Sequence, residues 1–225
     1  MKLIIIGTST TAKTIFSFIS KYNLYEVLGF AVNKKYIKES TFCNLPIYAI
    51  EDLKPDAEYS LFIAIQWNRL NADRKDLYAK LKSKGFKFAN IISPNAIING
   101  EIEGENCWIA DMAVVDFGTK IKNNVFVKVG AMIGPNVYIN DHCFIGAKST
   151  IGGATKIGMQ SFVGLNATIF DTVEIGEKCI IGACSIIKRN IPNYTKCTSS
   201  LENLMIKTYD EEIIEEKLLF SKNIR

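Results

Sequence analysis

An aliphatic residue recurs at every sixth position through the second half of the chain, from Ile109 to Ile187. Each of these positions holds isoleucine or valine, usually two places after a small or β-branched residue, and glycine often follows directly. Such a hexapeptide suits a short strand followed by a corner, where glycine accepts tight backbone. Three hexapeptides would close a triangular rung that cannot bury its core alone. The pattern therefore predicts a left-handed parallel β-helix of stacked hexapeptide repeats over residues 109–187.

In a stack of this kind, residues 18 positions apart lie above one another. Cys107, Cys143 and Cys179 are 36 residues apart, which is two rungs, so they should line one interior column about 10 Å apart. That separation is too long for a disulfide or a shared metal ion. None of the six cysteines forms a CxxC pair, and the single histidine, His142, does not favour a zinc site. We therefore expect reduced cysteines and no metal.

The first part of the chain alternates short apolar runs with helical patterns. Strands are predicted at residues 2–8, 27–32, 60–65 and 86–92, and helices at residues 10–22 and 70–84. This alternation predicts a small Rossmann-like α/β domain over residues 1–93, with Pro94 at the boundary to a β-helix domain over residues 94–190. The tail, residues 191–225, should carry a short C-terminal helix at about 209–221 that caps the β-helix.

Composition changes this picture little. The chain has 225 residues, 48% of them hydrophobic, and a formal net charge of +4, which is typical of a soluble globular protein. Its lysines are scattered, so no stripe for nucleic acid is indicated. No apolar run reaches the length of a signal peptide or a membrane span. We expect a cytoplasmic protein.

The turn after the first predicted strand, Gly7-Thr8-Ser9-Thr10, lacks an intact GxGxxG dinucleotide fingerprint. Its backbone N–H groups and hydroxyls still stand at the start of a predicted helix, where they could bind a phosphate. The alternative interpretation is that the turn only caps the helix.

Several segments together are similar to the bacterial sugar O-/N-acyltransferase family, which includes sialic acid O-acetyltransferases and N-acetyltransferases of nucleotide-linked 4-amino sugars. The segments are Ile6-Gly7-Thr8, Gly29-Phe30-Ala31-Val32-Asn33, Phe62-Ile63-Ala64-Ile65, Gly85-Phe86-Lys87, Ile92-Ser93-Pro94-Asn95-Ala96 and the hexapeptides, with residues 162–169 and 181–183 matching at the level of a subfamily. The resemblance covers nearly the whole chain. It implies that the α/β domain holds a nucleotide sugar, that the β-helix forms a homotrimer, and that acetyl-CoA lies between neighbouring subunits without a metal.

The resemblance also assigns residues to each ligand. It implies substrate contacts from Gly7, Thr8, Ser9, Thr10, Asn33 and Lys34, although the family prefers glycines near positions 8–10 and an acid near positions 32–33. It implies a path for the pantetheine arm of acetyl-CoA past Gly153, Gly164, Ala167 and Gly182, with Lys188 near the phosphates.

The main departure from the family lies at its general base. The His-Asp or His-Glu pair of the family falls on Pro135-Asn136, and Pro135 offers neither a base nor an N–H group. Gly153 lies 18 residues later, directly below Pro135, and its N–H could bind the thioester oxygen. Asn136 could orient a substrate amine or hydroxyl by hydrogen bonds.

Two side chains are candidates for the missing base. His142 lies one hexapeptide after Pro135, at the next corner of the triangle, so it could reach this site only from a neighbouring subunit; a structural role is favoured. Asp116 lies 19 residues before Pro135, in the rung directly above, where a carboxylate about 5 Å away could take a proton. The alternative for Asp116 is an ordinary surface acid.

The missing base bears on the reaction. An alcohol needs a strong base to attack a thioester, whereas an amine needs only to be neutral. We therefore expect an acetyl-CoA-dependent N-acetyltransferase that acts on a nucleotide-linked amino sugar in surface-glycan (O-antigen or lipopolysaccharide) biosynthesis. The alternatives are a sugar O-acetyltransferase that uses His142 or Asp116, and a non-catalytic trimeric paralogue.

Overall fold

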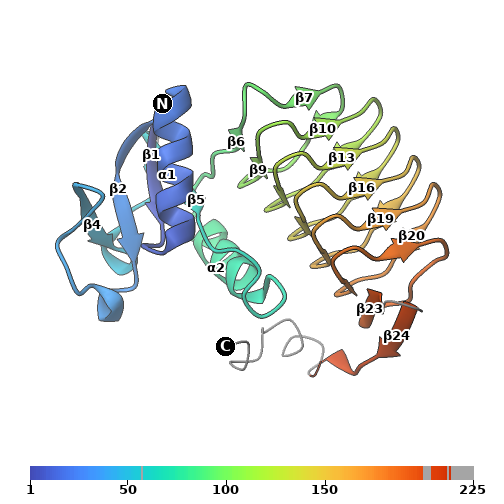
Figure 1. The fold of residues 1–225 in the computed structure, drawn as a ribbon. Coiled ribbons are helices and arrows are strands. Elements are labelled where there is room, and N and C mark those ends of the chain that lie inside the picture. The colour runs from blue at the N-terminus through green and yellow to red at the C-terminus, as the bar shows by residue number, and fades with distance from the viewer. Residues whose placement is uncertain (57, 200–203, 212, 214–225) are drawn as a thin grey trace.

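The computed structural model describes residues 1–56, 58–199, 204–211 and 213 of the chain. An α/β unit lies beside one side of a three-sided coil of stacked rungs (Figure 1). The α/β unit has a sheet with strand order β3-β4-β2-β1-β5. Its elements are β1 (Lys2–Ile6), α1 (Thr10–Tyr22), β2 (Glu26–Val32), η1 (Lys34–Tyr36), β3 (Thr41–Phe42), β4 (Leu45–Ala49), η2 (Ile50–Asp52), β5 (Tyr59–Ile63) and α2 (Ala72–Ser83).

The α/β core follows from the alternation of side chains along β1. Leu3 and Ile5 belong to the cluster that holds α1, and Ile4 and Ile6 to the cluster that holds α2, so the two helices cover opposite sides of the sheet. The predicted helix at 10–22 is confirmed, and it ends at Asn23, which has a left-handed φ of 51°. The strands predicted at 2–8, 27–32 and 60–65 are confirmed with shifted ends.

Two predictions for this unit need correction. The second helix starts at Ala72 rather than at residue 70, because the residues before it have left-handed dihedral angles that a right-handed helix excludes. The strand predicted at 86–92 is not continuous. Phe88 makes one isolated bridge to β5, while Ile91 and Ile92 already form the first strand of the β-helix. The short strands β3 and β4 carry no clear period and were missed.

The coil has three sheets, which we number by the order in which the chain enters them. Face 1 contains β6 (Ile91–Ile92), β9 (Trp108–Ile109), β12 (Phe126–Val127), β15 (Phe144–Ile145), β18 (Phe162–Val163), β21 (Ile180–Ile181), β23 (Thr195–Ser199) and β24 (Leu204–Thr208). Face 2 contains β7 (Ile97–Ile98), β10 (Val114–Val115), β13 (Met132–Ile133), β16 (Thr150–Ile151), β19 (Thr168–Ile169) and β22 (Ile186–Ile187). Face 3 contains β8 (Glu101–Ile102), β11 (Lys120–Ile121), β14 (Tyr138–Ile139), β17 (Lys156–Ile157) and β20 (Glu174–Ile175). The first, second and third corners follow the strands of faces 1, 2 and 3.

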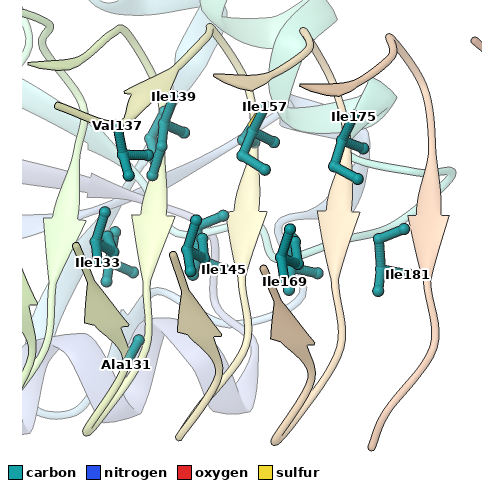
Figure 2. Packing of buried hydrophobic residues seen from close by; sticks show 14 of the residues in the cluster. Ala131, Ile133, Val137, Ile139, Ile145, Ile157, Ile169, Ile175 and Ile181 are labelled. Atoms are coloured by element: carbon teal, nitrogen blue, oxygen red, sulfur yellow. The ribbon is translucent and has the colours of Figure 1, made fainter. Parts of the chain in front are cut away.

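The 18-residue register is confirmed, since Phe126 pairs with Phe144 and Val115 with Ile133 in parallel strands. The aliphatic residues of the repeat fill the interior, as Figure 2 shows for Ile139, Ile157 and Ile175. The three cysteines of the interior column are free and fully buried. Burial raises the pKa of their thiols, so they are inert core residues.

Each corner after the strands from β9 to β21 turns at the third residue after the aliphatic one, which has a left-handed φ, as at Asn124, Asn136 and His142. The glycines that directly follow the aliphatic residue serve a different purpose. A Cβ on Gly164 would lie 2.5 Å from the backbone nitrogen of Ala183 in the next rung, so this position needs glycine for space. Asparagine and histidine tolerate the left-handed region better than most residues, which explains their presence at the turning position.

The three faces have different surroundings. The outward aromatic residues of face 1 receive the α/β unit, with Phe62 stacked on Phe126 at 5.7 Å between ring centroids. Face 3 carries exposed ion pairs such as Lys156 with Glu174. Face 2 and its flanking corners expose large apolar side chains: Ile97, Met112, Phe117, Val129, Met132, Leu165, Phe170 and Ile186.

The described part of the C-terminal tail is a hairpin, in which β23 continues face 1 and β24 pairs antiparallel with it. The helix predicted at 209–221 lies almost wholly outside the described residues. None of the helices in the described part of the chain is long and apolar enough to cross a membrane.

Candidate functional site

A pocket of about 420 Å³ opens at the carboxyl edge of the α/β sheet. It is built from the end of β1, the first turns of α1 and the segment that follows β5, which we call the wall segment (residues 64–68). The lining residues are Gly7, Ser9, Thr10, Thr11, Thr14, Ala64, Ile65, Gln66, Trp67 and Asn68. The carboxyl edge of a parallel sheet beside a helix N-terminus is where α/β folds bind phosphate-bearing ligands.

Only some of the substrate-binding residues that the sequence predicts line this pocket. Gly7, Ser9 and Thr10 line it. Ser9 occupies the N-cap position of α1, and its side chain makes no capping hydrogen bond. Gly7 has a φ of 120°, a conformation that glycine adopts far more readily than other residues.

Thr8, Asn33 and Lys34 are not among the lining residues. Asn33 precedes the short helix η1, and Lys34 is exposed, with its backbone N–H donating to the Glu51 carboxylate at 2.9 Å. Asn33 and Lys34 directly follow β2, the neighbour of β1, so they lie along the same edge of the sheet but outside the pocket.

Trp67, which sequence reasoning missed, joins the pocket to the β-helix. Its ring lines the pocket and packs edge-on against Phe144, with centroids 4.9 Å apart, and against Phe162 at 6.0 Å. Phe144 and Phe162 are themselves stacked on face 1. A tryptophan in the loop that follows a buried strand, at the carboxyl edge of the sheet, is the signal that could have identified it.

The second corner brings together the residues around the expected general base. The Asp116 N–H donates to the Ile133 carbonyl, the Asn136 N–H to the Phe117 carbonyl, and the Ala154 N–H to the Pro135 carbonyl. Asp116 therefore lies in the rung before Pro135 and Gly153 in the rung after it. This register agrees with the sequence analysis.

The polar groups of this corner have local partners. The Asp116 carboxylate is half-buried and accepts the Phe117 N–H at 2.8 Å. Asn136 is exposed, with its side-chain oxygen lying over Gly118. The Gly153 N–H donates to the Asp171 carboxylate at 2.5 Å, so it can bind a thioester oxygen only if Asp171 gives way. Asp171 was missed, although it lies 18 residues after Gly153.

His142 lies at the third corner, beneath α2. It is 9% exposed, its Nδ1 is 2.9 Å from the Asn124 side-chain nitrogen, and its ring packs against Tyr78. Burial lowers the pKa of His142 to about 4, and the charges of Arg74 and Lys75 add to this effect. The histidine is a neutral, hydrogen-bonded part of the interface between α2 and the β-helix.

The predicted acetyl-CoA residues lie at different corners. Gly164 and Gly182 are at the first corner, whereas Gly153 is at the second. Lys188 directly follows the last strand of face 2, is exposed, and has its ammonium 5.4 Å from the Phe170 ring centroid. Within one chain, the first-corner and second-corner residues do not form one site.

Ala167 has no exposed side-chain surface to offer to the predicted path. It is fully buried in the β-helix core, because it holds the small interior position two residues before Ile169. Across the described ranges, no group of three or more histidine, cysteine or acidic side chains could hold a metal ion.

The stacked hexapeptides and the α/β unit define the class as a hexapeptide-repeat β-helix fold with an N-terminal α/β domain. Residues 118–153 match the family described as bacterial transferase hexapeptide (six repeats), and residues 154–189 match the hexapeptide repeat of succinyl-transferase. No curated protein matches the chain by sequence.

Solved structures match over nearly the whole chain. A histidine-to-asparagine variant of perosamine N-acetyltransferase from Caulobacter crescentus, in complex with CoA and GDP-perosamine, has a TM-score of 0.78 at 21% identity, covering 93% of this chain and 98% of its own. The acetyltransferase domain of PglB from Neisseria gonorrhoeae in complex with acetyl coenzyme A has a TM-score of 0.77 at 22% identity, covering 88% and 96%. WeeI from Acinetobacter baumannii has a TM-score of 0.79 at 17% identity, covering 92% and 100%. The resemblance to bacterial hexapeptide-repeat sugar acyltransferases is thus confirmed at the level of the fold.

Proposed function

We propose that this protein is an acetyl-CoA-dependent N-acetyltransferase that acts on a nucleotide-linked amino sugar in surface-glycan biosynthesis. The observation that carries the proposal is a phosphate-type pocket joined through Trp67 to a hexapeptide β-helix. Structures of the Caulobacter crescentus enzyme of the same fold hold CoA together with GDP-perosamine. We propose that the protein works in the cytoplasm.

A homotrimer is part of this proposal. Face 1 is covered by the α/β unit and face 3 carries charges, whereas face 2 exposes apolar residues such as Met132 and Ile186 at more than half of their surface. Exposed apolar surface of this kind favours association. Pairing face 2 of neighbouring copies would set a first corner, with Gly164 and Gly182, opposite a neighbour's second corner, with Pro135 and Gly153. Acetyl-CoA would then lie between two copies.

The chemistry fits an amine. A neutral sugar amine attacks the thioester carbonyl carbon, the carbon–sulfur bond breaks, and CoA leaves as a thiolate that takes up a proton. The proton that the amine loses passes to the Asp116 carboxylate or to water. Asn136 orients the amine by a hydrogen bond, and Gly7, Ser9 and Thr10 hold the phosphates of the nucleotide. Lys188 is exposed and offers a positive charge to the phosphates of CoA.

The O-acetyltransferase alternative is weaker for His142, because a buried imidazole with a lowered pKa is a poor base near neutral pH. A non-catalytic trimeric paralogue is the second candidate. It is favoured by one observation: the Gly153 N–H, proposed for the thioester oxygen, is bonded to Asp171.

The test is an acetylation screen with acetyl-CoA and UDP-, GDP-, dTDP- and CMP-linked amino sugars, matched with the corresponding hydroxyl sugars. We expect transfer to an amino sugar, micromolar CoA binding by calorimetry, and an active His142→Ala variant. Efficient transfer to a hydroxyl sugar alone, lost in His142→Ala, would establish the O-acetyltransferase instead. Absence of both CoA binding and transfer would establish the non-catalytic alternative. Light scattering on the same sample reports the trimer.

A further inference from the structure

Arg74, in the first turns of α2, is a fully buried cation that contacts the pocket wall. Its side chain has no exposed surface, and one terminal nitrogen, Nη1, donates to the carbonyl oxygens of Ile65 and Gln66 at 3.2 and 3.1 Å. Both of these residues line the nucleotide pocket. The guanidinium also lies over the Phe126 ring on face 1, 4.0 Å from its centroid.

The other terminal nitrogen of Arg74, Nη2, binds the β-helix. It donates to the carbonyl oxygens of Asn124 and Cys143 at 3.1 Å each, and to that of His142 at 3.4 Å. These residues belong to two successive rungs at the third corner and the start of face 1. The planar fork of one guanidinium therefore bridges the pocket wall and the β-helix, which the single ammonium of a lysine cannot do.

The burial of Arg74 is costly, and its partners are all neutral. No carboxylate pairs with the guanidinium among the residues that the structure describes, and its Nε is buried without a hydrogen-bond partner there. Burial lowers the pKa of Arg74 to about 9. A buried cation without an anion opposes folding, so packing alone would favour an apolar residue here.

The segment that connects the wall to α2 is strained in the same region. Arg69, Leu70 and Asn71 have consecutive φ values of 45°, 51° and 64°. Left-handed backbone is unfavourable for residues such as arginine and leucine, and asparagine tolerates it better. The strain is held by the β-helix, since the buried Leu70 packs against Ile180 and the Asn71 side chain donates to the Ser161 carbonyl at 3.4 Å. Strained backbone that its surroundings hold in place is often found at ligand-binding segments.

We propose that Arg74 is a positioning residue that fixes the wall segment of the nucleotide pocket on the β-helix, so that a bound nucleotide sugar is presented at a constant place relative to the acetyl-transfer corner. The inference rests on the proposed function and deepens it. Arg74 touches neither substrate. It acts through the carbonyl groups of Ile65 and Gln66 and through the strained turn that follows them.

The kinetic test compares Arg74→Lys and Arg74→Met with Leu81→Ala. Leu81 is buried in α2 in the cluster on the opposite side of the sheet from α1, so its truncation destabilises the domain without touching the Arg74 contacts. With GDP-perosamine, or the nucleotide amino sugar that turns over in the screen, both Arg74 variants should raise the KM for the nucleotide sugar about tenfold and leave the KM for acetyl-CoA within about twofold. Leu81→Ala should change neither KM. Unchanged nucleotide-sugar KM in Arg74→Lys would overturn the proposal.

Hydrogen exchange separates this proposal from the proposed function. Well below the melting temperature of each variant, amides of residues 64–71 should exchange faster in Arg74→Lys than in wild type, and in Leu81→Ala they should not. If the wild type transfers no acetyl group but this exchange pattern is found, the positioning role stands and the proposed function fails. Equal exchange of the segment in wild type and Arg74→Lys would refute the positioning role whatever the activity. If Arg74→Met does not fold, Arg74→Lys retains the charge and carries both measurements.

Discussion

The second and third corners of the β-helix have the same backbone turn and opposite surroundings. Asn136 at the second corner and His142 at the third have φ values of 56° and 64° and hold the same place in their hexapeptides. Asn136 is exposed beside Phe117, which is 66% exposed, whereas His142 is covered by α2. The repeat thus fixes the backbone position of each corner residue. The packing of the α/β unit then determines whether its side chain is exposed or covered.

The third corner carries a polar ladder that the second corner lacks. The Asn106 side chain accepts the Ile63 N–H at 2.8 Å and donates to Asn124 at 2.6 Å, and Asn124 meets His142 in the next rung. On the following rung Gln160 accepts a hydrogen bond from Lys75 of α2 at 2.8 Å. Because His142 bonds Asn124 and packs against Tyr78 of α2, it is part of the contact between the α/β unit and the β-helix.

The largest effect that we expect concerns the pH dependence of stability at the third corner. The pKa of His142 is about 4 in the folded chain, below the value near 6.5 of an unfolded chain, so folding favours the neutral ring. Stability should be full above pH 6.5 and should fall as the pH drops toward 4, by up to about 3 kcal/mol from this residue. Chemical denaturation at a series of pH values measures the slope.

The matched variant is His142→Asn, because asparagine accepts the left-handed φ and can extend the ladder from Asn124. It should fold, keep its activity, and lose most of the stability slope between pH 6.5 and 4. An undiminished slope in this variant would assign the pH dependence to other groups.

The next effect concerns catalysis at the second corner. Asp116→Asn keeps the acceptor for the Phe117 N–H but removes the carboxylate that we propose takes the proton of the amine. We expect kcat to fall about a hundredfold, with little change in melting temperature. The control is Asp141→Asn, which changes a half-buried carboxylate at the third corner that accepts from the Asn123 backbone and side chain. Equal activity losses in the two variants would remove Asp116 from the mechanism.

Sequence reasoning reached the β-helix because its information is periodic and local. Steps of 18 residues placed Asp116, Pro135 and Gly153 in consecutive rungs and put His142 at another corner, and the hydrogen bonds agree. The same 18-residue step also places Ala167 at the small interior position, where its side chain is fully buried. The sequence analysis explained the glycines by tight backbone alone. Gly164 is instead needed because a Cβ at this position would collide with the next rung.

The parts that sequence missed depend on contacts between the two units. Trp67 and Arg74 have no period, and their roles follow from face 1 of the β-helix, many residues away in the chain. The strand predicted at 86–92 failed for the same reason, since Ile91 and Ile92 find their partner in β9 rather than in the α/β sheet. Long-range packing overrides local propensity at such positions.

The smallest effect that we predict is a difference between two glycine-to-alanine variants. One of them, at Gly118, displaces a side chain of the second corner, and the other, at Gly130, does not. Gly118 and Gly130 have φ values of 70° and 67°, so either change to alanine costs about 1 kcal/mol in backbone strain. A Cβ on Gly130 would meet only the Lys148 Cγ at 3.6 Å, whereas a Cβ on Gly118 would collide with the Asn136 side-chain oxygen. Gly118→Ala must therefore displace Asn136.

If Asn136 orients the substrate amine, Gly118→Ala should lower kcat/KM about fivefold and Gly130→Ala should not, although both lose similar stability. Equal kcat/KM values in the two variants would show that the position of Asn136 does not matter for transfer.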